Sequence, residues 1–198
     1  MSDQGLKQPT ELAIFPLNLV LFPGATLPLK IFEQRYIDMT KACLRDELPF
    51  GVCLIRDGSE VGAPAEHETV GCSARIMHWD MPHTGIFLLA CTGEQAFRLH
   101  DCRTASNGLI SGGIEWLDRE DDVIEPAHLE TCRSALKTLA ENTGEDIFGG
   151  PARYEDPEWV SYRLCELLPI DNRHKQALLE QRGSGQRLAE ISRIIQPS

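Results

Sequence analysis

Residues 16–24 read PLNLVLFPG, and residues 27–36 continue as LPLKIFEQRY. The first segment is apolar and ends in Pro23-Gly24, a pair that favours a turn. Residues 27–31 then alternate between apolar side chains and Pro or Lys, which is typical of a strand, and Pro28 indicates an edge position or the start of that strand. Helical spacing follows over residues 33–45. We therefore expect a buried strand, a turn, an extended segment and a helix that meet in one core.

Short strand-like runs continue outward from this stretch in both directions. A hairpin connection is expected at residues 80–85, and Gly93-Glu94 is interpreted as a turn between two separate strands. Many short strands with frequent turns predict an antiparallel barrel or sandwich rather than a parallel sheet. The expected strands cover residues 11–15, 50–55, 70–79, 86–91, 95–101 and 109–117.

The pattern changes after the acidic run 118–122, which is expected to be a solvated linker. Helices are then predicted to begin near Pro126, Asp156-Pro157, Asp171 and Ser184, each at a capping residue or first-turn proline. Short loops between them favour an up-and-down bundle. The sequence thus predicts an α+β protein with a loose leader (1–10), a β-rich lobe with one helix (11–117) and a helical bundle lobe (118–198).

Composition limits the functions that this chain can have. The 198 residues carry a net charge of -11, which should repel nucleic acid and anionic membrane surfaces. The N-terminus lacks the apolar core of a signal peptide, and no apolar run is long enough to span a bilayer. The seven cysteines are odd in number and form no CxxC pair. We expect a cytoplasmic protein with reduced, mostly buried thiols.

Taken in order, these motifs resemble the N-terminal, substrate-binding domain of the Lon ATP-dependent protease, a family also found as stand-alone proteins and in cereblon. The resemblance covers roughly residues 10–195. One departure is Ala96, where the family often has arginine. The matching residues are Phe15-Pro16-Leu17, Val20 to Gly24, Leu27-Pro28-Leu29, Ile31-Phe32-Glu33, Arg35-Tyr36, Met39, Phe50-Gly51-Val52, Val61-Gly62, Gly71-Cys72, Ala74, Ile76, Gly93, Phe97-Arg98, Leu167-Leu168-Pro169, Lys175-Gln176, Leu178-Leu179-Glu180 and Arg187-Leu188.

The resemblance implies a six-stranded, PUA-like pseudo-barrel followed by a small helical bundle. It also implies a non-catalytic module that recognises unfolded or extended polypeptide and delivers substrates to a protease or gates their entry. The sequence contains no Gly-x4-Gly-Lys-Ser/Thr loop for a nucleotide phosphate and no Ser–Lys peptidase domain. We therefore do not expect an enzyme. A small-molecule-binding or hydrolytic protein that reuses the fold remains the alternative.

Two groups of residues are candidates for peptide binding. Glu33, Arg35 and Tyr36 could form the polar rim of a groove, although a helix cap, a salt bridge and a core tyrosine would explain the same residues; Arg35 and Tyr36 are expected to face away from Glu33. Met77, Trp79 and Met81 lie at and beside the predicted hairpin tip. Trp and Met are frequent at the centres of protein interfaces. The alternative for Trp79 is packing on the barrel or under the helical lobe.

Metal binding is not expected. Cys72 and His78 share a strand face but lie roughly 20 Å apart, too far to hold one ion. His100 and Cys102 are closer, yet nothing in the sequence pairs their strand uniquely with another cysteine. Neither a cofactor nor a metal is therefore predicted, and Trp116 and Trp159 are interpreted as core or lobe-to-lobe packing residues.

Overall fold

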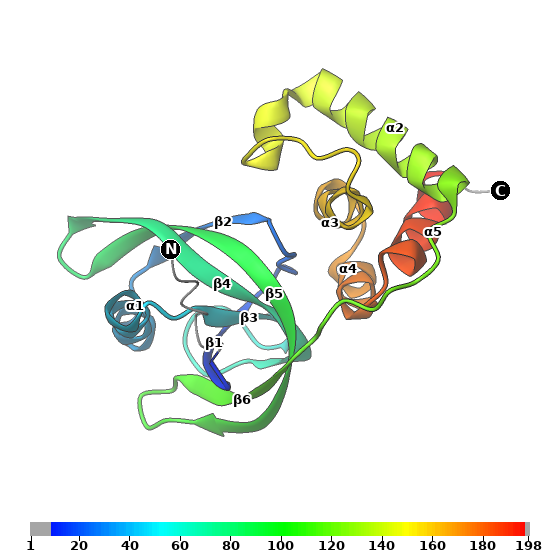
Figure 1. Cartoon of the computed structure of the whole chain (residues 1–198). Coiled ribbons are helices and arrows are strands. Elements are labelled where there is room, and N and C mark those ends of the chain that lie inside the picture. Colours follow the sequence, from blue (N-terminus) through cyan, green and yellow to red (C-terminus); the bar gives the residue numbers. More distant parts are fainter. Residues whose placement is uncertain (1–8, 197–198) are drawn as a thin grey trace, which may run out of the picture.

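The computed structural model of the protein describes residues 9–196 and has an α+β fold (Figure 1). The expected leader at residues 1–10 lies mostly outside the described residues. A β-rich lobe comes first and a helical lobe second. The elements are β1 (Glu11–Leu17), β2 (Thr26–Ile31), α1 (Gln34–Asp46), β3 (Phe50–Asp57), β4 (Glu66–His83), β5 (Ile86–Thr104), β6 (Ile110–Trp116), α2 (Pro126–Thr143), the 3-10 helix η1 (Glu145–Phe148), α3 (Pro157–Leu167), α4 (Asn172–Glu180) and α5 (Ser184–Ile195).

The six strands form a pseudo-barrel in the order β2-β5-β4-β3-β1-β6, which β5 closes by also pairing with β6. Pro28 lies on β2 at the edge of this sheet, as expected, because an edge strand tolerates the missing N–H of proline. One pair departs from the antiparallel prediction: β1 runs parallel to β3, with Ile14 opposite Gly51. The connection through β2 and α1 is long enough to reverse the chain direction between them.

Strand β5 is continuous, and the prediction of two strands separated by a turn at Gly93-Glu94 is wrong. Gly93 instead lies within β5, where the backbone of the loop before β2 approaches it closely. The Gly24 N–H donates to the Gly93 carbonyl at 2.7 Å, and the Gly93 N–H donates to the Ala25 carbonyl at 2.9 Å. A glycine that permits close backbone contact has the same local sequence signal as a turn glycine.

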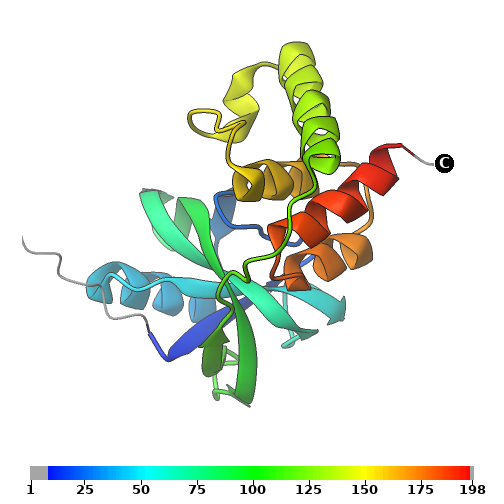
Figure 2. The ribbon, with the colours of Figure 1, turned by 45° about the vertical axis from the view of Figure 1, so that its right-hand side comes forward.

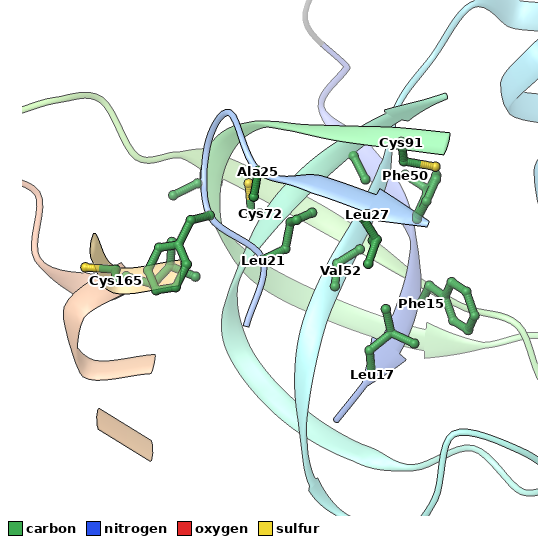
Figure 3. Close-up of a cluster of buried hydrophobic side chains, with 14 of the residues drawn as sticks. Phe15, Leu17, Leu21, Ala25, Leu27, Phe50, Val52, Cys72, Cys91 and Cys165 are labelled. Carbon is green, nitrogen blue, oxygen red and sulfur yellow. The ribbon is translucent and has the colours of Figure 1, made fainter. Parts of the chain in front are cut away.

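The apolar run at residues 19–22 is not the strand that we expected. It belongs to a loop at residues 18–25 that fills the end of the barrel. Leu21, Phe22 and Ala25 are buried there although they belong to no strand. Figure 3 shows Leu21 and Ala25 beside side chains from the strands, with Cys165 of α3 close to the same loop. One apolar core therefore continues from the barrel into the helical lobe.

The helical lobe packs on the barrel through α3 and α4, whereas α2 lies farthest from the sheet (Figure 2). Arg163 of α3 makes the central polar contact of this junction. Its side chain is 2% exposed, and it donates to the carbonyl oxygens of Pro23 at 2.8 Å and Gly24 at 3.0 Å. Gln176 of α4 also donates to the Val70 carbonyl at 3.1 Å. These bonds tie the helices directly to the loop and to β4.

The acidic run 118–122 was expected to be a solvated linker, but it docks on the helical lobe. Asp122 Oδ1 and Oδ2 accept hydrogen bonds from the Gly185 and Gln186 N–H groups at 3.0 and 2.8 Å. The cap residue of α5 is Gly183, which has no side chain to supply this contact. Glu120 also pairs with Arg182 at 2.8 Å. The linker carboxylate thus serves as the cap of a distant helix.

We expect Asp122→Ala to destabilise the fold by about 1 kcal/mol, because two helix N–H groups lose their acceptor and the favourable charge at the helix N-terminus disappears. Urea denaturation of the full chain measures this change. The neighbouring Asp121→Ala removes a similar exposed carboxylate and should change stability by less than about 0.5 kcal/mol. Equal midpoints for the two variants would contradict a capping role for Asp122.

Candidate functional site

The hairpin between β4 and β5 carries three exposed apolar side chains, which we call the hairpin surface: Met77, Trp79 and Met81. Their exposed fractions are 55%, 54% and 47%. The Trp79 ring packs at 5.8 Å from the Phe87 ring, which is buried, so one side of the indole is anchored while half of it faces solvent. The hairpin projects past the rest of the sheet (Figure 1). Exposed apolar clusters of this kind are typical of interaction sites.

Glu33, Arg35 and Tyr36 have a largely structural environment. Arg35 Nη2 lies 3.1 Å from Glu33 Oε2, so the expectation that the two side chains point apart is wrong. Arg35 Nη1 donates to the Gly108 carbonyl at 3.2 Å. The buried Tyr36 ring packs 4.1 Å from the Phe15 ring. Glu33 precedes α1 without capping it through its side chain. The salt bridge and core tyrosine therefore match the alternative explanation, although a hollow of about 380 Å³ lies beside Glu33 and Arg35.

A feature that sequence reasoning missed is a cleft of about 500 Å³ between the C-terminal end of α1 and the sheet. We call it the acidic cleft. Its residues come from separate segments of the chain, so no local motif marks it. The residues that line it include Asp46, Glu47, Leu48, Arg75, Glu94 and Trp116. Arg75 is held in place by Glu94 and donates from Nη1 to the Glu47 carbonyl at 2.8 Å.

The buried ionisable groups pair with one another inside the helical lobe, and Arg163 also reaches the 18–25 loop of the barrel. Glu166 Oε2 lies 2.7 Å from Arg163 Nη1, and Lys175 Nζ donates to the Glu166 carbonyl at 2.7 Å. Burial raises the pKa of the Glu166 carboxyl, while the neighbouring cations oppose this shift. Burial likewise lowers the pKa of Lys175. A second buried arginine, Arg187, lies 4.0 Å from the Tyr162 ring and donates to the Ser161 hydroxyl. These contacts give each buried charged side chain a structural role, so none of them needs a catalytic explanation.

The cysteines are thiols, and six of the seven are buried; Cys102 is exposed. Burial raises the pKa of Cys43 to about 11 and that of Cys91 to about 12, which keeps both protonated and poorly reactive at neutral pH. Within residues 9–196, no group of three or more His, Cys, Asp or Glu side chains is arranged to hold a metal ion. Among the same residues, no helix is long and apolar enough to cross a membrane.

The fold and these surfaces define a class: a two-lobed α+β protein in which a PUA-like pseudo-barrel is joined to a helical bundle. The sequence profile described as "ATP-dependent protease La (LON) substrate-binding domain" matches residues 11–197. The chain belongs to this family of substrate-binding domains.

Relatives agree with this assignment. The crystal structure of a Lon N-terminal domain protein from Xanthomonas campestris has a TM-score of 0.74 and 32% sequence identity, covering 92% of this chain and 97% of that one. A Lon protease from Anaeromyxobacter dehalogenans is 30% identical over 67% of this chain and 16% of its own length. The zebrafish (Danio rerio) protein cereblon is 29% identical over 54% of this chain and 25% of its own length. The chain thus spans no more than a quarter of these two curated relatives.

Proposed function

We propose that this protein is a non-catalytic module that binds unfolded or extended polypeptide. The observation that carries the proposal is the match to a substrate-binding domain family over residues 11–197. The name of that family refers to substrates of an ATP-dependent protease, and such substrates are polypeptides. We further propose that the bound chain is delivered to a protease in the cytoplasm or gated there before proteolysis.

The hairpin surface supports this function. An unfolded chain exposes apolar side chains that a folded protein buries, and Met77, Trp79 and Met81 offer matching apolar contacts. Methionine adapts its shape to varied partners, which suits a site that must accept many sequences. Within residues 9–196, β2 pairs only with the hairpin strand β5, from Thr26 to Ile31, which leaves its other edge free. A bound extended segment could also add to this edge.

The alternative of a small-molecule-binding or hydrolytic protein lacks such support. Its expected sign was a deep pocket in which polar side chains with shifted pKa values converge. The clearest pKa shifts of carboxyl and amino groups in the buried regions are those of Glu166 and Lys175, and both residues make their polar contacts within the helical lobe. We therefore give the polypeptide-binding function precedence.

The test is peptide binding by the full chain with and without the hairpin surface. We expect Trp79→Ser combined with Met81→Ser to weaken binding of a fluorescent, apolar-rich unfolded peptide by about tenfold, because two of the three apolar contacts are lost. Fluorescence anisotropy measures the affinity. Val123→Ser is the matched control, since Val123 is 86% exposed and lies in the linker, away from the hairpin. Absence of peptide binding, or equal affinities for both variants, would refute this assignment of the site.

A further inference from the structure

The acidic cleft is the centre of a longer track over the surface. A second hollow of about 350 Å³ shares Glu47, Leu48 and Arg75 with the cleft and reaches Ile76, the residue before Met77 of the hairpin surface. A third hollow of about 180 Å³ shares Glu94 and Gln95 with the cleft and lies at the junction of the two lobes. Together the hollows lead from the lobe junction along the end of α1 to the hairpin, a course that suits an extended chain.

Negative charge predominates along this track. The three hollows are lined by five acidic residues, Asp46, Glu47, Glu94, Asp118 and Glu158. Asp46 is paired with the exposed Arg45 at 2.6 Å, and Asp118 accepts a hydrogen bond from Gln95 at 3.2 Å. They contain three guanidinium groups, those of Arg75, Arg119 and Arg182. Each of these arginines already pairs with a carboxylate, at Glu94, Glu158 and Glu120 respectively. Within the described residues, the Glu47 carboxylate accepts no hydrogen bond and forms no ion pair. The cleft therefore retains an acceptor that is available to a cation.

The end of α1 strengthens the negative character at this point. Glu47 is the C-cap residue of the 13-residue helix, and a helix C-terminus carries partial negative charge. Glu47 adopts φ 55°, a left-handed conformation that glycine favours and that other side chains rarely adopt. A glutamate at this position is unfavourable for the backbone.

Part of the cleft is apolar, and this favours an arginine or lysine side chain over a metal ion. Pro9, Leu48, Pro49 and Trp116 form this part of the lining. Trp116 is held by its Nε1 donating to the Pro9 carbonyl at 3.1 Å and by the Phe97 ring at 6.4 Å. A metal ion would need clustered oxygen ligands and gain nothing from an apolar wall. Arginine and lysine have apolar stems that pack on such walls and charged ends that reach carboxylates.

We propose that the acidic cleft binds an arginine or lysine side chain of an extended polypeptide whose neighbouring apolar residues reach the hairpin surface. This inference rests on the proposed function and narrows its substrates to segments that combine a basic residue with apolar ones. Acidic segments would be rejected by the same carboxylates.

The test uses the full chain and three labelled peptides of about ten residues, identical except for a central arginine, citrulline or glutamate. Citrulline keeps the shape of arginine without its charge. We expect the arginine peptide to bind about tenfold more tightly than the citrulline peptide at low salt, with a smaller difference at high salt. The glutamate peptide should bind most weakly. Equal affinities for arginine and citrulline would overturn the cleft proposal while leaving the proposed function intact, whereas no binding of any peptide would overturn both.

Substitutions in the cleft test whether it is the source of the preference for arginine over citrulline. Asp46→Asn combined with Glu47→Gln should remove most of the preference for arginine over citrulline, whereas Glu141→Gln, on the exposed surface of α2, should retain it. Glu47→Gly should also reduce the preference while the denaturation midpoint stays equal or rises, because glycine favours the left-handed backbone. Loss of affinity through unfolding would lower that midpoint. A preference that is fully retained in the Asp46/Glu47 double variant would overturn the assignment to this cleft.

Discussion

Replacing Arg163 with methionine is expected to destabilise the protein by about 3 kcal/mol or more, because a buried ion pair and two long-range hydrogen bonds are lost together. The side chain reaches from α3 to the Pro23 and Gly24 carbonyls of the 18–25 loop. Methionine fills similar volume but donates no hydrogen bond. Both carbonyls and the Glu166 carboxylate would then be left without this partner in a buried environment. Chemical denaturation of the full chain, followed by circular dichroism, measures the change.

The matched control is Arg153→Met, since the Arg153 side chain is 61% exposed and its ion pair with Asp156 is long, at 3.6 Å. It should change stability by less than about 1 kcal/mol. Glu166→Gln in the Arg163→Met background should recover part of the loss by removing the unpaired charge. Equal losses in the Arg163 and Arg153 variants would contradict the role of Arg163 as the junction between the lobes.

The same variant should show a defined pH dependence. Burial already raises the pKa of Glu166 above its ordinary 4.5, and loss of the guanidinium raises that pKa further. The folded variant then binds a proton that the unfolded chain releases, so the contribution of this carboxyl to stability is fully present below pH 4.5 and is lost as pH rises through the folded-state pKa. The deficit of Arg163→Met relative to the parent protein should therefore be larger at pH 7 than at about pH 5. An equal deficit at both values would contradict burial of the carboxylate.

Local patterns predicted most elements of the fold, because they depend on neighbouring residues. The alternation at residues 27–31 and the helical spacing at residues 33–45 correspond to β2 and α1. Long-range contacts could not be predicted in this way. Arg163 looked like an ordinary helical arginine, yet its acceptors lie 139 and 140 residues away in the chain. Asp122 likewise looked like part of a solvated acidic run, and only the folded chain brings it to the start of α5.

The two candidate surfaces show the same difference between local and long-range features. Met77 and Trp79 were chosen from residue type and position near a predicted hairpin, and both are exposed there. The acidic cleft has no sequence signature, because Glu47 and Trp116 come from elements that are far apart in the chain. A positive φ at Glu47 is equally invisible in the sequence. Binding surfaces assembled from several segments require the folded structure, whereas a single exposed hairpin does not.

Replacing Gly93 with alanine is expected to be about as damaging as the loss of Arg163, at about 3 kcal/mol. A Cβ atom at residue 93 would lie 2.3 Å from the Phe22 carbonyl oxygen and 3.1 Å from its carbon. These are backbone atoms, so the loop itself must move. That movement would break the two hydrogen bonds between Gly93 and the loop and displace the buried Phe22 ring. Denaturation midpoints and slopes of the full chain measure the loss.

Gly150→Ala is the control for this substitution, because a Cβ atom there meets nothing within 4 Å and the backbone needs no positive φ. It should leave stability within about 1 kcal/mol of the parent protein. Combining Gly93→Ala with Arg163→Met gives the decisive comparison. The Gly93 backbone and the Arg163 side chain both contact the 18–25 loop. Once alanine displaces the loop, the Arg163 contacts are already weakened, so the double variant should be destabilised by less than the sum of the two single variants. Strict additivity would mean that Gly93 and Arg163 stabilise the fold independently, and it would contradict the loop as the common joint between barrel and helices.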